Sequence, residues 1–209
     1  MRTPTLRRLA GSLMFGLLLL PGAARADGPL GLEDAVRLAL GNNERALKAP
    51  LRPYQQAGLS WLKFIQDLGS GGVLADDMGL GKTVQTIALL LAVKQEDKEV
   101  RALIVAPTSV VRNWERELQR FSPTLSIALW HGQNRKDQID QVKEAEVIIT
   151  SYALLRRDEE FLAGLDLTYA ILDEAQHIKN PLSATAAAAK RLKSKRRLAL
   201  TGTPIENRL

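Results

Sequence analysis

The residues with the clearest chemical meaning form the run DDMGLGKT at positions 76–83. This run lies between a short apolar stretch, residues 72–75, and an apolar-periodic stretch, residues 84–93, which together predict a strand, a loop and a helix. Glycines in such a loop let several backbone N–H groups point at one anion, and the start of the helix adds partial positive charge. The pattern therefore indicates a loop that binds phosphate groups.

Two side chains of this loop have the types needed to hold a nucleotide together with magnesium. Lys82 is expected to reach the β- and γ-phosphates, and the Thr83 hydroxyl is expected to help hold Mg²⁺. The usual pattern G-x-x-x-x-G-K-[ST] begins with glycine, whereas this chain has Asp76 at that position. The difference argues against a GTPase-like loop and fits helicase-like ATPases, in which only Gly79 and Gly81 are constrained. The alternative is a glycine-containing turn that precedes a lysine by chance.

A second chemical pattern is an acidic pair at the end of another predicted strand. Residues 170–172 are apolar and lead directly into Asp173 and Glu174. Carboxylates at the end of a buried strand are costly unless they meet a cation or solvent. Beside a magnesium nucleotide, Asp173 could hold the metal and Glu174 could orient and deprotonate the attacking water. The alternative is an exposed acidic turn.

The elements that must position these groups alternate between helix and strand patterns from residue 51 onward. Pro53 is placed to begin a helix that extends to about Leu68. Short apolar runs that alternate with helices predict an α/β fold, with a parallel sheet, helices on both faces and ligands at the carboxyl ends of the strands. The expected strands are residues 73–75, 102–106, 126–130, 147–150, 169–172 and 198–201.

Composition and charge narrow the class of protein. The chain has 209 residues, of which 45% are hydrophobic and 25% charged, so it can form one globular domain with a real core. It contains no cysteine, which excludes disulfides and thiolate metal sites. Much of the net charge of +6 comes from lysines and arginines in residues 190–197. Such a patch suits nucleic acid or polyphosphate, or it is a solvated helix end.

The first 26 residues have the pattern of a secretory signal peptide. Three arginines among the first eight residues are followed by an apolar run at 9–20 and by Ala-Arg-Ala at 24–26. The apolar run is shorter than the roughly 20 residues that a spanning helix needs, so we expect no stable membrane span. The alternative is a hydrophobic N-terminus that arose by chance.

Residues 27–49 are expected to form a short helical segment and a linker. Apolar residues at positions 32, 35, 36, 39 and 40 have helical spacing, and Gly41-Asn42 supplies a stop. Together with the leader, this segment resembles the start of outer-membrane efflux channel proteins. Export would separate a phosphate-binding loop from ATP. We therefore expect a join between two unrelated pieces near residues 44–50.

Six short motifs, in their order along the chain, resemble helicase superfamily 2 and, more narrowly, the Swi/Snf-type DNA-dependent ATPases. The superfamily likeness rests on DDMGLGKT at 76–83, DEAQH at 173–177 and LTGTP at 200–204. The narrower likeness rests on LRPYQ at 51–55, APTSVVRNWE at 106–115 and ITSY at 149–152. The resemblance covers residues 50–209 and implies the first RecA-like lobe of a DNA motor that uses ATP and Mg²⁺.

The resemblance implies a nucleotide site assembled from several of these motifs. Gln55 would read the adenine edge, with Arg52 and Tyr54 shaping the adenine pocket. Asp173 would hold Mg²⁺ and Glu174 would serve the attacking water. The positions that would bind the phosphates and the metal are Asp76, Gly79, Leu80, Gly81, Lys82 and Thr83.

The resemblance also implies a connection from the nucleotide site to double-stranded DNA. Gln176 and His177 would couple the nucleotide site to Thr201 and Thr203. Contacts with the DNA backbone position a protein without reading sequence, so binding should be sequence-independent and salt-sensitive. The residues that would make these contacts are Pro107, Thr108, Ser109, Ser151 and Tyr152.

Four of the aromatic and histidine side chains also have plainer explanations. Trp114 is expected to pack in the core or on the surface rather than to stack on a base. His131 is expected to be structural, because nothing beside it completes a metal-binding set. Tyr54 could be a core residue, and His177 could be packed or could face solvent.

The expected function is the ATP-binding lobe of a Swi/Snf-type DNA-dependent ATPase or translocase. In that family a second lobe supplies arginine fingers, and no matching segment lies before Leu209, so we expect a fragment that hydrolyses ATP weakly. Such an arginine is worth about 10³–10⁵ in rate in related enzymes. The ATPase part would be cytoplasmic, which conflicts with the leader. The rivals are an exported start of an efflux protein and an inert nucleotide- or DNA-binding remnant.

Overall fold

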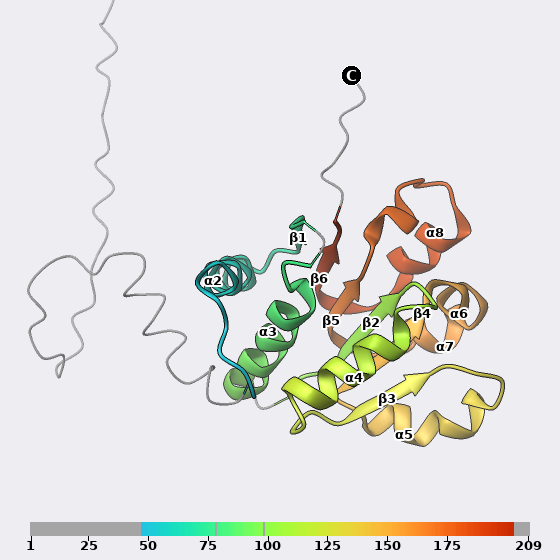
Figure 1. Ribbon diagram of the computed structural model, residues 1–209. Coiled ribbons are helices and arrows are strands. Elements are labelled where there is room, and N and C mark those ends of the chain that lie inside the picture. The colour runs from blue at the N-terminus through green and yellow to red at the C-terminus, as the bar shows by residue number, and fades with distance from the viewer. Residues whose placement is uncertain (1–46, 78, 98, 203–209) are drawn as a thin grey trace, which may run out of the picture.

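The computed structural model describes residues 47–77, 79–97 and 99–202, drawn as coloured ribbon in Figure 1. The predictions for residues 1–46, which include the leader and the efflux-like segment, lie outside these residues, as does the coupling role of Thr203. Within the described ranges, no helix combines the length and the apolar character that crossing a bilayer requires.

The described residues form one six-stranded sheet in which all neighbouring strands are parallel, in the order β1-β6-β5-β2-β4-β3. The predicted parallel α/β fold is therefore confirmed. Every residue of β2, β4 and β5 is buried, as expected for parallel strands covered on both faces. The strands are β1 (Gly72–Leu74), β2 (Ala102–Ala106), β3 (Ile127–Trp130), β4 (Val147–Ser151), β5 (Leu167–Leu172) and β6 (Ser194–Leu200).

Helices cover both faces of this sheet (Figure 1) and enclose two apolar clusters. Alternate residues of β2 face opposite sides, with Ile104 in the first cluster and Leu103 and Val105 in the second. The first cluster is covered by α2 (Pro53–Asp67), α3 (Lys82–Asp97) and α4 (Val111–Phe121). The second is covered by α5 (Ile139–Glu144), α6 (Tyr152–Arg157), α7 (Glu159–Ala163) and α8 (Ala184–Arg191).

Helix α3 is the most deeply buried of the helices, which explains how it holds the phosphate loop in place. Its residues 87–93 are all buried, so the helix lacks the polar face of a surface helix. Each large apolar side chain buried in this way contributes about 1.5–3 kcal/mol. The start of α3, which follows the loop, is therefore anchored by the core and not by the loop itself.

Strand β6 begins at Ser194, earlier than the sequence predicted, and the reason lies in its neighbours. β1 pairs only with Leu198 to Leu200, so residues 194–197 lie beyond the end of β1 and have a strand on one side only. Charged side chains are tolerated there because that edge reaches solvent. The apolar pattern used for the prediction therefore missed the first half of the strand.

The basic residues between 190 and 197 are partly structural. The Arg197 guanidinium donates to the carbonyl oxygens of Ala189 (3.0 Å), Lys190 (2.9 Å) and Leu192 (2.7 Å) at the end of α8. Carbonyls at a helix C-terminus lack partners within the helix, and a nearby arginine satisfies them. Arg191 pairs with Glu159 at 2.6 Å. These contacts favour the helix-end interpretation for the two arginines.

Candidate functional site

The predicted motifs meet at the carboxyl edge of the sheet, because all six strands run in the same direction. The phosphate loop follows β1, the acidic pair follows β5, and Thr201 follows β6, which lies between them. The Thr201 N–H donates to the Leu74 carbonyl at 3.1 Å, and the Asp173 N–H donates to the Val105 carbonyl at 2.8 Å. Backbone hydrogen bonds therefore join the ends of neighbouring strands just below the site.

The phosphate loop depends on its two glycines. Gly79 has φ of 84° and Gly81 has φ of 80°, a conformation that L side chains rarely adopt. Gly81 also lies so close to Gln55 that a Cβ atom would be 2.4 Å from Gln55 Nε2. The Lys82 ammonium donates to the Asp76 carbonyl (2.7 Å) and to the Asp77 carbonyl (3.0 Å), so it folds back over its own loop.

A buried glutamine explains how the loop tolerates aspartate at its first position. Gln85, on the second turn of α3, is fully buried and donates from Nε2 to Asp76 Oδ2 at 3.2 Å. The carboxylate is thereby tied to the helix that carries Lys82 and Thr83. Sequence reasoning missed Gln85, because its apolar neighbours made it look like part of an ordinary helix.

Gln55 connects the start of α2 with the phosphate loop. Its Oε1 accepts from the Arg52 backbone N–H at 2.9 Å, and its Nε2 donates to the Leu80 carbonyl at 3.2 Å. Its predicted role at the adenine edge stays a prediction, since both ends of its amide contact protein here. Arg52 is exposed, and Tyr54 is 40% exposed, so the alternative that Tyr54 is a core residue is wrong.

Asp173 is a buried carboxylate that directly follows β5. It is 8% exposed, and it accepts from Trp114 Nε1 at Oδ2 (2.7 Å) and from the Glu174 N–H at Oδ1 (3.0 Å). Burial raises the pKa of Asp173, while the hydrogen bond from Trp114 and the positive charge of Lys82 act in the opposite direction. The loop and the acidic pair lie at the same edge of the sheet, on the two strands that flank β6.

Glu174 has a strained backbone. Its φ is 49° and its ψ is 56°, and it is the one non-glycine residue with positive φ in the part of the chain that the structure describes. A left-handed conformation costs a non-glycine residue about 1–3 kcal/mol and is found most often at functional sites. The surrounding contacts must hold Glu174 in this geometry.

A chain of hydrogen bonds leads from Glu174 to the end of β6. Gln176 Nε2 donates to Glu174 Oε2 at 2.8 Å, and the Thr201 hydroxyl donates to Gln176 Oε1 at 3.1 Å. The structure thus brings together two of the residues for which coupling was predicted. His177 instead stacks on Tyr152, with ring centroids 5.0 Å apart and an interplanar angle of 23°.

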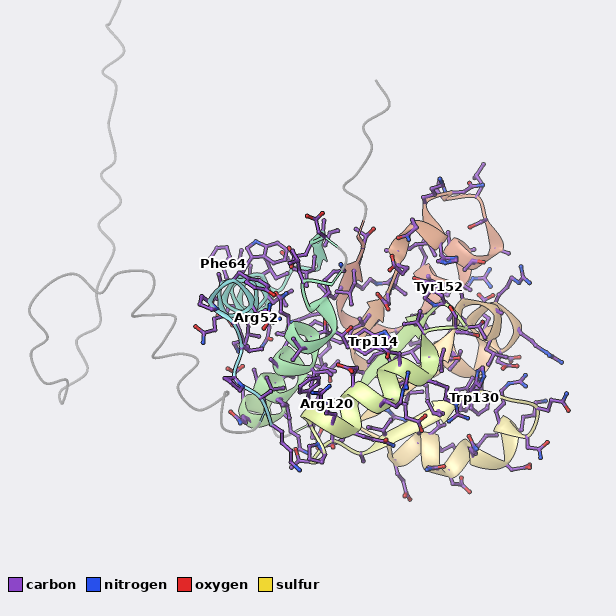
Figure 2. All side chains as sticks on the ribbon, in the orientation of Figure 1. Arg52, Phe64, Trp114, Arg120, Trp130 and Tyr152 are labelled. Carbon is purple, nitrogen blue, oxygen red and sulfur yellow. The ribbon has the colours of Figure 1, made fainter. Side chains whose placement is uncertain are left out.

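Trp114 and Tyr152 contact Asp173 from opposite faces of the sheet, a feature that sequence reasoning missed. Trp114 is fully buried, so its predicted packing role is confirmed, and its indole also donates to the carboxylate. The Tyr152 hydroxyl donates to the Asp173 carbonyl at 2.7 Å. Burial, together with the charges of Asp173 and Glu174, raises the pKa of Tyr152. Both side chains are buried, and Figure 2 labels them.

The residues predicted to contact DNA differ in exposure. Thr108 and Ser109 are exposed and Pro107 is partly exposed. Ser151 is buried, and its hydroxyl accepts from the Leu154 N–H at 3.3 Å as the N-cap of α6. The Tyr152 side chain is likewise buried and turned toward Asp173. The side chains of residues 107–109 are therefore accessible to a ligand. Those of Ser151 and Tyr152 instead make internal contacts at the start of α6.

A hollow of about 570 Å³ lies beside these segments, at the carboxyl ends of β2, β3 and β4. Thr108 and Ser151 border it, and so does His131, whose buried Nδ1 has no hydrogen-bond partner among the described residues. Arg157 adds a positive charge to the rim. The hollow adjoins the expected DNA-contact segments and lacks the phosphate loop, so it is separate from the nucleotide site.

A glycine loop between a strand and a buried helix, with an acidic pair at the same edge of an all-parallel sheet, defines the RecA-like class of P-loop folds. The chain belongs to the SNF2-related domain family, whose model matches residues 54–209. The match leaves residues 1–53 uncovered, and the predicted likeness of residues 1–48 to efflux channels receives no support.

Relatives and solved structures place the chain in the same family. It is 47% identical over 168 residues to YwqA of Bacillus subtilis strain 168, which carries the name of an ATP-dependent helicase/translocase. It is 39% identical over 176 residues to the TATA-binding protein-associated factor MOT1 of Saccharomyces cerevisiae. These alignments include 78% of this chain, which spans 18% of YwqA and 9% of MOT1.

Among solved structures, the Sulfolobus solfataricus SWI2/SNF2 ATPase core in complex with double-stranded DNA superimposes with a TM-score of 0.73 at 48% identity. The similarity covers 78% of this chain and 34% of that chain. The Sulfolobus solfataricus SWI2/SNF2 ATPase core domain, in a second structure, superimposes with a TM-score of 0.69. The RecA-like fold predicted for this chain is confirmed by these neighbours.

Proposed function

We propose that residues 50–209 are the ATP-binding lobe of a DNA-dependent ATPase or translocase of the Swi/Snf type. The observation that carries this proposal is the placement of Lys82 and the Asp173–Glu174 pair at one edge of the sheet, after strands β1 and β5 that both flank β6. The names of the helicase relatives support it. Because ATP is the substrate, this lobe would work in the cytoplasm; residues 1–26 retain the pattern of a leader.

The residues present fit a magnesium nucleotide. Lys82 holds its ammonium over the loop with two carbonyl contacts, which can be exchanged for stronger bonds to phosphate oxygens. Thr83 lies at the start of α3, and each Asp173 oxygen that accepts one hydrogen bond keeps a further acceptor position. Magnesium, when bound with the nucleotide, neutralises the charge that develops on the phosphates.

Glu174 is the group proposed to orient the attacking water. Gln176 holds one of its carboxylate oxygens at 2.8 Å, which fixes the carboxylate and leaves the other oxygen for water. Gln176 also accepts from Thr201, at the end of the strand next to the phosphate loop. A displacement of Thr201 would therefore be transmitted to the Glu174 carboxylate through the Gln176 side chain alone.

Hydrolysis at a useful rate would require a second lobe. The matched relatives are far longer than this chain, which accounts for less than a fifth of YwqA. An arginine supplied in trans contributes about 10³–10⁵ in rate in related nucleotide hydrolases. We infer that this lobe binds Mg-ATP, hydrolyses it weakly by itself and requires a partner lobe for translocation.

Double-stranded DNA is the proposed track. Thr108 and Ser109 are exposed beside the hollow at the ends of β2, β3 and β4, where hydroxyls and backbone N–H groups could contact phosphates. The Sulfolobus solfataricus neighbour was solved with double-stranded DNA, which supports this assignment. Contacts of this type make affinity fall steeply with salt and give no preference for sequence.

The test is nucleotide affinity in the full chain with Lys82→Ala. Loss of charge-assisted bonds to the phosphates should weaken binding of a fluorescent ATP analogue by about 10- to 100-fold in the presence of Mg²⁺. Lys63→Ala is the control, because Lys63 on α2 pairs with Glu96 at the C-terminal end of α3, the end opposite the loop. Equal affinities of wild type and Lys82→Ala would remove the proposed function.

A further inference from the structure

Asp173 is held between two aromatic side chains that come from opposite faces of the sheet. Trp114 belongs to the apolar cluster under α2, α3 and α4, whereas Tyr152 belongs to the cluster under α6, α7 and α8. Trp114 Nε1 donates to the carboxylate at 2.7 Å, and the Tyr152 hydroxyl donates to the Asp173 carbonyl at 2.7 Å. The two hydrophobic layers therefore meet at one acidic residue.

Each aromatic residue is attached to a segment expected to lie against DNA. The Trp114 N–H donates to the Val110 carbonyl at 3.0 Å, and the Val110 N–H donates to the Pro107 carbonyl at 2.8 Å. These bonds join the turn at residues 107–110 to the first turn of α4. Tyr152 directly follows Ser151, which caps α6. A displacement of either segment would move the ring that contacts Asp173.

The two contacts fix different parts of the acidic pair. Trp114 is the one side chain in the described contacts that donates to the buried Asp173 carboxylate, and the remaining donor is the neighbouring Glu174 N–H. Without the indole, the carboxylate could rotate about its last bond. Tyr152 holds the carbonyl of the peptide that leads into Glu174, whose φ of 49° depends on the orientation of that peptide.

Resting on the proposed function, we propose that Trp114 and Tyr152 are positioning residues that hold the Asp173–Glu174 pair ready for the magnesium nucleotide. Through them, the turn at residues 107–110 and the start of α6 act directly on the acidic pair. DNA bound to these segments and Mg-nucleotide bound at Asp173 would then raise each other's affinity, because coupling between two sites is reciprocal.

The first test separates metal-dependent from metal-independent nucleotide affinity. A fluorescent ATP analogue is titrated into the full chain with Mg²⁺ and, separately, with EDTA. Trp114→Phe keeps an aromatic side chain, although a smaller one, and removes the N–H donor. The gain in affinity caused by Mg²⁺ should therefore shrink about tenfold while the affinity in EDTA stays the same. Tyr152→Phe should reduce the same gain. A loss of packing alone would weaken both affinities together.

Trp130→Phe is the matched control for the indole. Trp130 is also buried and also donates from Nε1 to a carboxylate, Asp158 Oδ2 at 2.9 Å, but it lies on β3 at the far edge of the sheet. The variant Trp130→Phe should leave the gain in nucleotide affinity caused by Mg²⁺ unchanged. If Trp114→Phe keeps the wild-type gain while Lys82→Ala loses nucleotide binding, this inference is overturned and the proposed function stands.

The second test uses the wild-type chain and so does not depend on any variant folding. The indole N–H resonances of Trp114 and Trp130 are followed by NMR while Mg-nucleotide, or a short DNA duplex without nucleotide, is added. Both additions should shift the Trp114 resonance, and Mg-nucleotide should leave that of Trp130 in place, because Trp130 lies on β3, away from the phosphate loop and the acidic pair. A Trp114 resonance that responds to neither addition, under conditions where both ligands bind, would overturn the inference.

Discussion

Two acidic residues of the site, Glu174 and Asp76, stand at positions where glycine would be the more usual residue. Glu174 adopts a left-handed backbone without being glycine, and Asp76 replaces the glycine usual in phosphate loops. Glutamine side chains hold both carboxylates: Gln176, two residues further on, donates to Glu174, and Gln85 on α3 donates to Asp76. The site is therefore maintained by contacts around it, and single substitutions should report on them.

The two loop glycines provide a matched pair at this scale. Gly79→Ala should lower the free energy of unfolding by about 1–2 kcal/mol, because its φ of 84° is strained for alanine although the surrounding space is open. Gly81→Ala has the same strain, and its Cβ would also collide with Gln55 Nε2. It should cost more stability and also displace Gln55 from the loop.

Urea unfolding and nucleotide titration check this prediction. Gly81→Ala should lose more stability than Gly79→Ala and should bind the nucleotide analogue more weakly. Adding Gln55→Ala to Gly81→Ala should recover part of the lost stability, because the collision is with that side chain. Identical effects of the two glycine substitutions would contradict the close approach seen here.

At the scale of elements, the contrast lies between α3, which anchors the nucleotide site, and the basic end of α8. Helix α3 is buried along residues 87–93, so the phosphate loop is followed by a helix that the apolar core holds in place. Helix α8 ends just before β6 begins, so its C-terminal end lies at the amino ends of the strands, opposite the nucleotide site. The basic residues at 190–197 therefore lie at the end of the sheet opposite Lys82.

Removing the Arg197 side chain should test whether it is a structural cap. Arg197→Ala leaves three carbonyls at the end of α8 without their donor, so the free energy of unfolding should fall by about 1–2 kcal/mol. The exposed Lys195→Ala, two residues away, should stay within about 0.5 kcal/mol of wild type. Urea unfolding of the two variants decides between a cap and a merely solvated charge.

Across the whole molecule, two apolar clusters stabilise opposite faces of one sheet, and a buried ion pair between Arg135 and Asp158 lies beside the edge strand β3. Arg135 holds Asp158 through two hydrogen bonds, Nε to Oδ2 at 2.5 Å and Nη2 to Oδ1 at 2.8 Å. Trp130 donates to the same carboxylate. This cluster lies beside β3, away from the acidic pair at the end of β5.

The Asp158 cluster predicts an acid-sensitive component of stability. The hydrogen bonds from Arg135 hold the pKa of Asp158 below its ordinary value of 3.8. A carboxyl group whose pKa is depressed by folding stabilises the fold fully above that ordinary value, and the contribution is lost as pH falls through the folded value. Asp158→Asn should therefore be less stable near neutral pH, by about 3 kcal/mol, and lose less on acidification.

The measurement is urea unfolding between about pH 7 and pH 2.5, the range in which carboxylates become protonated. The difference between wild type and Asp158→Asn should narrow as the pH falls below 3.8. Asp140→Asn is the control, because Asp140 is exposed and its oxygen lies 3.9 Å from Lys143. A difference that stays constant with pH would show that Asp158 acts through packing alone.

Local sequence predicted the fold and the main groups of the site to a large extent. β2 was predicted at its observed limits, because a short apolar run between polar segments is typical of a buried parallel strand. The loop around Lys82 and the pair at Asp173 were predicted to lie at one edge, because parallel strands carry their carboxyl ends to the same side. These features depend on residues close together in the chain.

Other features were decided only by the tertiary structure. The contacts of Trp114 and Tyr152 with Asp173, and of Gln85 with Asp76, join residues that were not adjacent in any motif. The early start of β6 likewise depends on where β1 ends. The types of chemical groups, and the edge of the sheet that carries them, could be predicted from the sequence because strand direction and loop chemistry depend on neighbouring residues. Tertiary packing decided which neighbour holds each group, because only the folded chain brings distant donors within hydrogen-bond reach.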